Sequence, residues 1–531
     1  MKIAFINPRF PDSLWGFQGI SDLVGARSGQ APLGLVTVAA LTPPEIEVEL
    51  LDENCHPLRF DDLTADVAAI GCWSVQYGRA VEIARELKRR GKLVVAGGPY
   101  PTLSPEHFDG GPFDVVFEGE AELTWPEFCR DLAAGAPRPR YRQPGNIDVR
   151  HSPVPRFDLL RQGEYLYYYV QTTRGCPFRC EFCDIIVTDG RVPRTKSVQQ
   201  VIAEIETIVG LGGRYVTFSD ANFIGNVKYA EELLRALVEF GRARGFPVTF
   251  SAEMTVTVAE KPQLLGLLRE ANFTSIFVGI ESPRAESLVE TRKPQNLRRS
   301  LLECIRRIQS HNIMVIAGMI VGFDHDDTRI FQEQFDFLME AGVAFTTCGI
   351  LTAIDKTPLY ARLAREGRLL PYDSADVHGH GAADLNFIPA GMTRDELLQG
   401  YNWLIRALYK YESYGARLAT TLRSFAAGSP PPRAGLWSRE RLLIALKVLL
   451  HFALGRDPAR RRFFFRTLAD ALHGRPSWEK VVCAVSYMIA HKHFHEFVTQ
   501  THGDPEVVGD VSPFANVVKI DRPLHREVVA S

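Results

Sequence analysis

The sequence predicts an α/β protein that combines a doubly wound parallel sheet, a partial (β/α)6 barrel and a helical C-terminal region. Short β-branched runs alternate with helical patterns through the first part of the chain, and the alternation resumes near residue 165. The strand pattern fades after about residue 385. Because 531 residues exceed what one core holds, we expect several domains. The predicted parts are 1–140, a linker at 141–164, a barrel at 165–385 and a helical domain at 386–531.

The first part has the pattern of a doubly wound sheet. The apolar runs KIAFIN, DVAAIGCW, KLVVAGG and DVVFEGE are typical of buried parallel strands, and AVEIARELKRRG has a helical period. Ligands of such sheets bind at the carboxyl ends of the strands. No G-x-G-x-x-G follows the first run, which argues against a dinucleotide. The prolines and weak periodicity of residues 136–158 indicate a linker.

The second part repeats the alternation about six times. The predicted strands are YYYVQTTRGC, RYVTFSD, PVTFSAE, SIFVGIE, MVIAGMIVGF and FTTCGILT, and helical patterns separate them. Six such units in about 200 residues predict a partial parallel barrel. Beyond it, residues 394–500 are mostly helical, with a proline-rich break at 428–435.

Composition narrows the function classes. A net charge of −2 and 46% hydrophobic residues give no global attraction to nucleic acid. The N-terminus lacks the pattern of a signal peptide, and Lys447 and His451 interrupt the longest apolar run, so we expect no spanning helix. Nine cysteines, mostly isolated in apolar segments, suit a reducing cytoplasm better than a disulfide framework.

Three cysteines carry the strongest signal. Cys176, Cys180 and Cys183 follow a predicted strand, so their thiolates share one loop at the active end of the barrel. Crowded thiolates favour an iron–sulfur cluster or zinc. A closed zinc site needs a fourth ligand, and no Cys or His lies close in sequence. A cluster with one open iron fits better, because that iron can bind an amino acid's amine and carboxylate.

This C-x3-C-x2-C spacing, with the aromatic Phe182 before the last cysteine, resembles the radical S-adenosylmethionine superfamily over residues 165–385. The resemblance implies a [4Fe–4S] cluster on the three cysteines, which cleaves S-adenosylmethionine to a 5′-deoxyadenosyl radical. It also implies a reducing partner such as flavodoxin or ferredoxin.

Strand-end residues match the superfamily's cofactor contacts by position. The resemblance implies contacts to S-adenosylmethionine from Asp220, Asn222, Glu253, Glu281 and the Gly318–Gly322 strand, and from Arg191 or Arg194 to the methionyl carboxylate. Strand-end acids also cap helices, and the arginines could equally pin their loop.

The first part resembles the cobalamin-binding domain of cobalamin-dependent radical enzymes. The loops after its strands are rich in small residues, and the resemblance implies that cobalamin lies near Trp73, Ser74, Gly97, Gly98 and Glu120. The D-x-H-x-x-G motif is absent, and His56 has the wrong spacing to replace it. We therefore expect cobalamin without a protein histidine below it, with Trp73 packing there. A fold that has lost its ligand is the alternative.

The C-terminal part is locally basic. Residues 401–500 hold 16 Lys and Arg against 6 Asp and Glu, and an Arg-Phe cluster at 460–466 adjoins the amphipathic stretch 441–454. Such helices lie on anionic membranes, or are solvated faces that cover a core. His491, His493 and His495 have no spaced carboxylate or Cys to complete a metal site. A similar tail accompanies bacterial lipid and hopanoid methylases.

Together these features predict a cobalamin-dependent radical methyltransferase acting on an unactivated carbon of a small molecule, with a lipid as one candidate. A polar displacement cannot methylate such a carbon, so a substrate radical must meet a methyl donor. The alternatives are a radical cyclase, oxidase or ring-contracting enzyme on the same architecture, and a non-catalytic cobalamin-binding sensor. We expect a cytoplasmic protein with peripheral membrane contact through the C-terminal domain.

Overall fold

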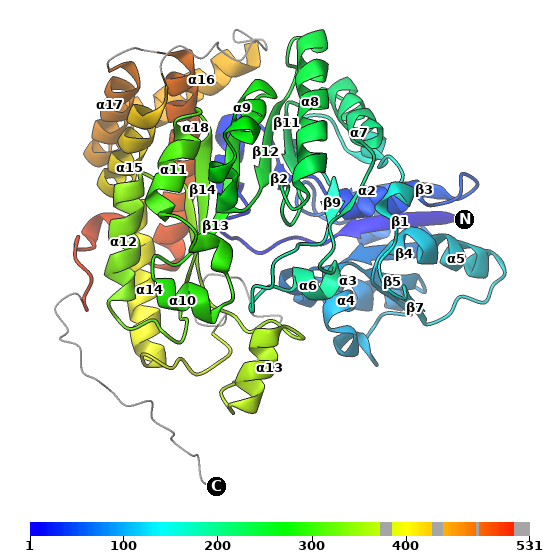
Figure 1. The fold of residues 1–531 in the computed structure, drawn as a ribbon. Helices are drawn as coiled ribbons and strands as arrows, with labels where there is room; N and C mark the ends of the chain where they lie inside the picture. The colour runs from blue at the N-terminus through cyan, green and yellow to red at the C-terminus, as the bar shows by residue number, and fades with distance from the viewer. Residues whose placement is uncertain (372–384, 427–438, 474–476, 515–531) are drawn as a thin grey trace.

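The computed structural model describes residues 1–371, 385–426, 439–473 and 477–514. The N-terminal sheet lies at one side, the barrel strands in the middle, and the C-terminal helices at the other side (Figure 1). The expected proline-rich break at 428–435 lies outside the described residues.

The N-terminal sheet has six parallel strands in the order β3-β1-β4-β5-β6-β7. Five of the six residues of β1 are buried, as expected for a sheet with helices on both faces. The order reverses between β1 and β4, which places a ligand-binding crevice at the carboxyl ends of those two strands. The strands are β1 (Lys2–Asn7), β3 (Glu47–Asp52), β4 (Val67–Gly71), β5 (Leu93–Gly97), β6 (Val115–Glu118) and β7 (Arg140–Arg142). The helices are α2 (Leu33–Ala40), α3 (Tyr77–Arg89), α4 (Pro99–Leu103) and α5 (Ala121–Ala133).

The barrel strands form a second parallel sheet in the order β15-β14-β13-β12-β11-β8-β2. Six of them are β8 (Tyr165–Val170), β11 (Tyr215–Phe218), β12 (Thr249–Glu253), β13 (Phe273–Glu281), β14 (Met314–Val321) and β15 (Thr346–Ile350). The covering helices are α7 (Val198–Gly210), α8 (Val227–Arg244), α9 (Pro262–Glu270), α11 (Leu301–Gln309) and α12 (Ile330–Ala341). Ser197 and Gln200 form a capping box that starts α7. The predicted fold class is confirmed.

The seventh strand comes from the N-terminal part of the chain. β2 (Ser28–Gln30) pairs in parallel with β8, and the carbonyl of Glu164 accepts from the backbone N–H groups of Arg27 and Ser28. The sequence analysis placed this segment in the N-terminal domain alone. A three-residue Ser-Gly-Gln strand has no hydrophobic pattern to reveal it, because backbone hydrogen bonds alone hold it.

The C-terminal helices pack on the side of the barrel and return to the N-terminus. They are α14 (Arg394–Tyr409), α15 (Tyr411–Ser424), α16 (Arg439–Ala453), α17 (Pro458–Leu472) and α18 (Trp478–Thr501). His493 of α18 accepts from the backbone N–H of Gly19 through Nδ1 at 3.2 Å, and its Nε2 lies 2.9 Å from the Ser13 carbonyl. One hydrophobic core runs through the barrel and these helices, while the two faces of the N-terminal sheet have cores of their own. None of the helices in the described parts combines the length and apolarity needed to cross a membrane.

Candidate functional site: a three-cysteine loop facing the N-terminal sheet

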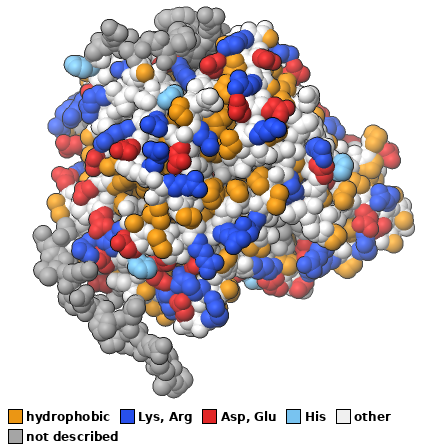
Figure 2. Space-filling model, in the orientation of Figure 1, with side chains coloured by type: hydrophobic (Ala, Val, Ile, Leu, Met, Phe, Trp, Pro, Cys, Tyr) orange, Lys and Arg blue, Asp and Glu red, His pale blue; other side chains and the backbone are white. Residues whose placement is uncertain are grey.

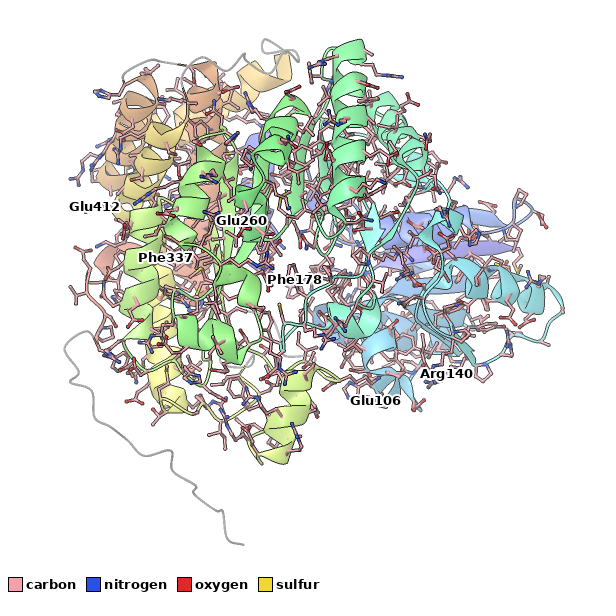
Figure 3. All side chains as sticks on the ribbon, in the orientation of Figure 1. Glu106, Arg140, Phe178, Glu260, Phe337 and Glu412 are labelled. Carbon is pink, nitrogen blue, oxygen red and sulfur yellow. The ribbon has the colours of Figure 1, made fainter. Side chains whose placement is uncertain are left out.

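The three cysteines lie on the loop between β9 (Thr173–Arg174) and α6 (Ile185–Thr188). All three are half-buried free thiols, whereas the other six cysteines are buried in hydrophobic surroundings. Burial raises the pKa of Cys183 to about 12, so a bound metal is needed to keep this sulfur ionised. The loop lies between the barrel strands and the N-terminal sheet, where Phe178 is labelled (Figure 3). Three adjacent thiols that are accessible from one side fit a [4Fe–4S] cluster with one open iron.

Backbone contacts fix the shape of this loop. The N–H of Cys176 donates to the carbonyl of Gly190 at 3.1 Å, and β9 pairs antiparallel with β10 (Arg194–Thr195). Gly175 has φ +96°, and a Cβ there would lie 2.7 Å from the Val192 carbonyl oxygen. Glycine is therefore required immediately before the first cysteine. The hairpin holds one end of the cysteine loop.

Glu181, between the second and third cysteines, holds the other end. Its N–H donates to the carbonyl of Thr291, and its own carbonyl accepts from the N–H of Leu359, both at 3.0 Å. Its carboxylate accepts from Arg362 of α13 (Pro358–Arg365) at 2.7 Å. Phe182 is half-buried, and its ring centroid lies 6.2 Å from that of Phe323. The loop is thus held rigidly against α13 and the end of β14.

Two of the strand-end residues expected to contact S-adenosylmethionine form hydrogen bonds within the protein. Asp220 is fully buried and accepts from the N–H groups of Thr172 and Thr173, at 2.6 and 2.9 Å, and from the Thr172 hydroxyl. Burial raises its pKa to about 6. Asn222 is also buried, and its Oδ1 accepts from the N–H of Thr255 at 3.3 Å. Asp220 therefore holds the strand end that leads into the cysteine loop.

The other two strand-end residues, Glu253 and Glu281, differ in exposure and in partners. Glu253 at the end of β12 is exposed, yet enough protein surrounds its carboxyl that lost hydration, followed by the charge of Asp220, raises its pKa to about 7. Glu281 is buried at the end of β13, has φ +65°, and forms an ion pair with Lys293. Glu253 is exposed toward a ligand, whereas Oε1 of Glu281 is already paired with Lys293. Their contacts to S-adenosylmethionine stay a prediction.

Arg194 and Glu120 form part of a buried ion-pair network between the N-terminal sheet and the barrel. Arg194 donates to Glu120 at 2.8 Å and to the Ile147 carbonyl at 2.6 Å, while Arg174 donates to Glu120 and Glu122. One expectation for Arg194 was that it holds its own loop in place, and its hydrogen bonds to the carbonyls of Ile147 and Asp189 agree with this. Arg191 is exposed.

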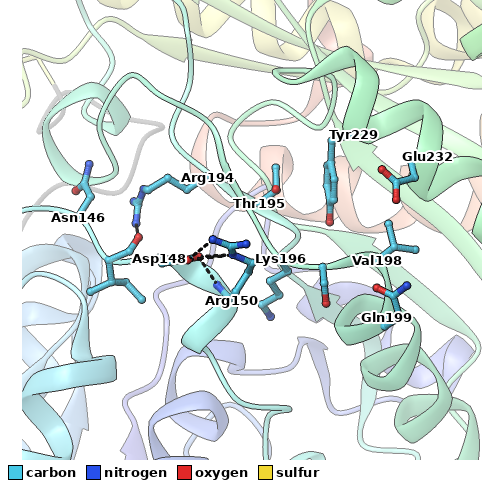
Figure 4. Close-up of a pocket in the computed structure, with 12 residues that line it drawn as sticks. Asn146, Asp148, Arg150, Arg194, Thr195, Lys196, Val198, Gln199, Tyr229 and Glu232 are labelled. Carbon is cyan, nitrogen blue, oxygen red and sulfur yellow. Dashed lines mark hydrogen bonds and ion pairs between the residues drawn. The ribbon is translucent and has the colours of Figure 1, made fainter.

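Arg194 also borders a cavity of about 630 Å³ behind the β9–β10 hairpin (Figure 4). Asp148 and Arg150 in its wall pair with each other, and Lys196 pairs with Glu204. Most charged side chains of this wall already have partners within the protein, so we assign none of them to the cysteine site.

The loops of the N-terminal sheet form the opposite wall. Trp73, two residues after the end of β4, has 54% of its surface exposed, which is unusual for so large an apolar ring. Gly97 ends β5, and Ser74 starts the turn into α3. Gly98 has φ +121°, and a Cβ there would lie 2.9 Å from the Cys72 carbonyl oxygen. α4, which starts after Gly98, packs against α6 of the cysteine loop. An exposed indole and a bare backbone at the carboxyl ends of β4 and β5, beside the contact of α4 with α6, suit a large flat ligand such as cobalamin.

A polar network that the sequence analysis missed supports this wall. Gln76 donates to the side-chain oxygen of Asn7 at 3.1 Å and to the Pro8 carbonyl at 2.6 Å. Asn7 donates to Asp52 at 3.1 Å, which also accepts from the Tyr165 hydroxyl at 3.0 Å. Asn7, Asp52 and Tyr165 lie on three separate strands, and Gln76 lies in the turn before α3, so only the fold brings them together.

The three C-terminal histidines do not form a metal site with one another. His491 bonds to the Tyr409 carbonyl, His493 contacts Ser13 and Gly19, and His495 approaches Glu506. Within the described ranges, Glu106, His107 and Asp355 bring one ligand atom each to within 4.8 Å of one another, as a single metal ion requires, but this group is largely exposed.

Comparisons with known proteins agree with this geometry. The Radical SAM superfamily model matches residues 170–362, and a domain of unknown function (DUF4070) matches residues 357–506. The chain is 36% identical over 397 residues to an uncharacterized methyltransferase of Synechocystis sp., which covers 74% of each chain. It is 31% identical over 460 residues to the hopanoid C-2 methylase of Rhodopseudomonas palustris, which covers 85% of each.

Solved structures share the fold. The methyltransferase TsrM from Kitasatospora setae, determined with cobalamin and a [4Fe–4S] cluster bound, has a TM-score of 0.60 at 14% identity, covering 89% of this chain and 99% of its own. The cobalamin-dependent enzyme OxsB has a TM-score of 0.59 at 15% identity, covering 94% and 80%.

A parallel barrel with an accessible three-cysteine loop, facing a doubly wound sheet, defines a radical S-adenosylmethionine enzyme. The chain belongs to the radical S-adenosylmethionine superfamily, and the two relatives described above are named as a methyltransferase and a methylase. The superfamily expected from the sequence is confirmed.

Proposed function

We propose that this enzyme transfers a methyl group to an unactivated carbon of a small, hydrophobic molecule. The observation that carries the proposal is that α4, which starts after Gly98, packs against α6, which follows the three half-buried cysteines. We assign cobalamin to residues 1–140 and the cluster with S-adenosylmethionine to residues 165–385. When bound, the cluster and S-adenosylmethionine supply hydrogen abstraction from carbon, and cobalamin supplies the methyl group.

The chain's own residues bind and orient these groups. Cys176, Cys180 and Cys183 hold three irons, while the β9–β10 hairpin and Arg362 keep the loop rigid. Glu253 at the end of β12 is an exposed carboxylate and is available to accept from an amine or hydroxyl.

The substrate class rests on the named relatives. The hopanoid C-2 methylase, similar over 85% of its length, supports a polycyclic lipid or another hydrophobic metabolite.

Product analysis tests methyl transfer. Anaerobic protein is incubated with S-adenosylmethionine, a reductant and a bacterial lipid extract, with Cys180→Ala as the control. The proposal predicts both S-adenosylhomocysteine and 5′-deoxyadenosine, with a lipid one methylene heavier, and none of these from Cys180→Ala. Formation of 5′-deoxyadenosine alone would instead support the cyclase, oxidase or ring-contracting alternative.

We also propose that α16 and α17 contact an anionic membrane surface. Four leucines of α16 and one directly after it have 44–69% of their surface exposed, namely Leu443, Leu446, Leu449, Leu450 and Leu454. Phe465 of the neighbouring α17 is 58% exposed, and exposed arginines flank it at 456, 461, 462 and 466. Lysine and arginine side chains gather at the upper left of Figure 2, where α17 lies. Four arginines contribute on the order of 4 kcal/mol toward anionic lipid.

Vesicle flotation tests this contact. The protein should float with vesicles of phosphatidylglycerol and phosphatidylcholine, and not with phosphatidylcholine alone. The double change Leu446→Glu with Leu450→Glu should abolish flotation, whereas Leu123→Glu, at an equally exposed leucine of the N-terminal domain, should not. Equal loss in both variants, or binding independent of lipid charge, would contradict the proposal. Such contact would place the enzyme at the cytoplasmic face of a membrane.

The electron donor is proposed to be a small acidic protein such as flavodoxin or ferredoxin. Arg179 and Arg191 are exposed on the two loops beside Cys176, and Val192, next to Arg191 in the chain, is 73% exposed. Two exposed arginines beside an exposed apolar side chain suit an acidic partner. Arg191→Glu should slow reduction by flavodoxin at low salt and leave reduction by dithionite unchanged; slowing of both would contradict docking there.

A further inference from the structure

The segment between α10 (Ala285–Glu290) and α11 forms a wall against the cysteine loop. The carbonyl of Thr291 accepts from the N–H of Glu181 at 3.0 Å. Asn296 donates through Nδ2 to the carbonyls of Gly279 and Ile280, both at 3.0 Å, which fixes the segment to the end of β13. Between these two anchors, Lys293 and Gln295 are 6% and 2% exposed. The anchors therefore hold two buried polar side chains next to the cysteines.

Gln295 reaches one of the cysteine sulfurs directly. Its Nε2 lies 3.6 Å from the Sγ of Cys180, within the range of a hydrogen bond to sulfur. A thiolate can only accept, so the amide must present its N–H to that sulfur once iron is bound. The Oε1 on the other side of the amide has no hydrogen-bond partner among the described residues. The amide is thus oriented by the sulfur rather than by the rest of its surroundings.

Lys293 brings a positive charge to the same place. Its ammonium pairs with the carboxylate of Glu281, and both side chains are less than a tenth exposed. Burial alone would lower the pKa of Lys293, but the charges of Glu281 and Cys180 outweigh it, so the amine stays protonated. In a buried setting that charge acts on Cys176 and Cys180 with little screening.

We propose that Gln295 and Lys293 raise the reduction potential of the [4Fe–4S] cluster. Adding one electron increases the negative charge on the cluster and its sulfurs, so an N–H donor and a buried cation stabilise the reduced state more than the oxidised state. Both are positioning residues that act on the cluster without binding iron. The inference rests on the part of the proposed function that puts the cluster on the three cysteines, and is independent of cobalamin and methyl transfer.

Potentiometric titration of the reconstituted cluster, followed by electron paramagnetic resonance without S-adenosylmethionine, tests this role. At the potential where the wild-type cluster is half reduced, Gln295→Leu should lower the ratio of reduced to oxidised cluster about tenfold, which is 59 mV for a one-electron couple. Gln295→Glu, of equal size, should lower it at least as far. Lys293→Met should lower the ratio and Lys293→Arg should restore it to within about twofold.

Gln309→Leu is the matched control. Gln309 is a buried glutamine of α11 that donates to the Ala341 and Gly342 carbonyls, away from the cysteine loop. Its replacement should leave the potential unchanged. A shift below about twofold in Gln295→Leu with full iron content, or an equal shift in Gln309→Leu, would overturn the inference. Loss of iron from both Gln295 variants would also overturn it, since the residue would then act in cluster assembly. A wild-type protein that assembles no cluster would instead refute the proposed function.

Discussion

Arg174 joins the two halves of the site, and its removal should destabilise the protein strongly. It lies two residues before Cys176 and donates to Glu120 at 2.8 Å and to Glu122 at 2.6 Å. The three side chains are 14%, 9% and 4% exposed, so these charges interact with little help from water. Burial by itself would raise the pKa of Glu122, but the charge and hydrogen bond of Arg174 reverse this and lower it.

The change Arg174→Met keeps most of the side chain's length and removes its charge. Breaking a buried ion pair from one side costs about 3–5 kcal/mol, because the remaining charge is left unpaired. Arg194 still pairs with Glu120, which points to the lower end, near 3 kcal/mol. For a domain of this size, a loss of about 3 kcal/mol lowers the melting temperature by roughly 6–12 °C.

The pH dependence of this loss follows from Glu122. Because its folded pKa lies below the ordinary value of 4.5, its contribution is present above that pH and disappears as the pH falls through the folded pKa. The difference in melting temperature between wild type and Arg174→Met should therefore be largest near about pH 7 and shrink below about pH 4.

Thermal unfolding followed by circular dichroism measures both effects, with Arg242→Met as the matched control. Arg242 forms an ion pair with Glu270 at 3.0 Å in which both side chains are more than half exposed, so its loss should cost less than about 1 kcal/mol. An Arg174→Met variant that melts no lower than Arg242→Met would refute the reasoning.

Three further predictions concern other parts of the structure. Asp326 is fully buried, and burial raises its pKa to about 7, so the stability of the wild type should fall as the pH rises from about 4 to 7. The variant Asp326→Asn should lack this slope and be more stable than wild type by more than about 1 kcal/mol near pH 8. Equal pH dependence of the two melting temperatures would contradict this. Gly98→Ala should abolish cobalamin uptake and leave the iron content normal. Gly91→Ala, also at positive φ but in open space, should leave cobalamin uptake unchanged. Equal uptake in both variants would contradict close approach of cobalamin to the backbone at Gly98. Trp73→Ala should weaken cobalamin binding about tenfold in equilibrium dialysis, and unchanged affinity would exclude Trp73 as a packing surface.

The elements that sequence patterns predicted are those with a strong hydrophobic period. The β1 run KIAFIN is buried on both faces, and the β14 run MVIAGMIV is buried on one face and partly buried on the other, so composition alone identified them as parallel strands. The cysteine loop was found because its spacing has a chemical requirement. β2 was missed because backbone hydrogen bonds hold it without a side-chain pattern.

The site was predicted less completely than the fold, because its buried partners come from distant segments. Asp220 and Glu281 were identified by their place at strand ends. Nothing in the sequence indicated that Thr172 would donate to Asp220 or that Lys293 would pair with Glu281. Gln295 lies in the stretch TRKPQN, which has no periodicity or motif, and its contact with Cys180 spans 115 positions. Such contacts depend on the tertiary fold rather than on local spacing.

The central claim is that one chain holds an iron–sulfur cluster and cobalamin at facing sites. The most direct test is the iron and cobalt content of protein purified without oxygen, reconstituted with iron, sulfide and hydroxocobalamin, and freed of unbound cofactor. The account predicts about four irons and about one cobalt per chain. Four irons without cobalt would contradict the cobalamin site and methyl transfer from it, and would leave a radical enzyme of another reaction type.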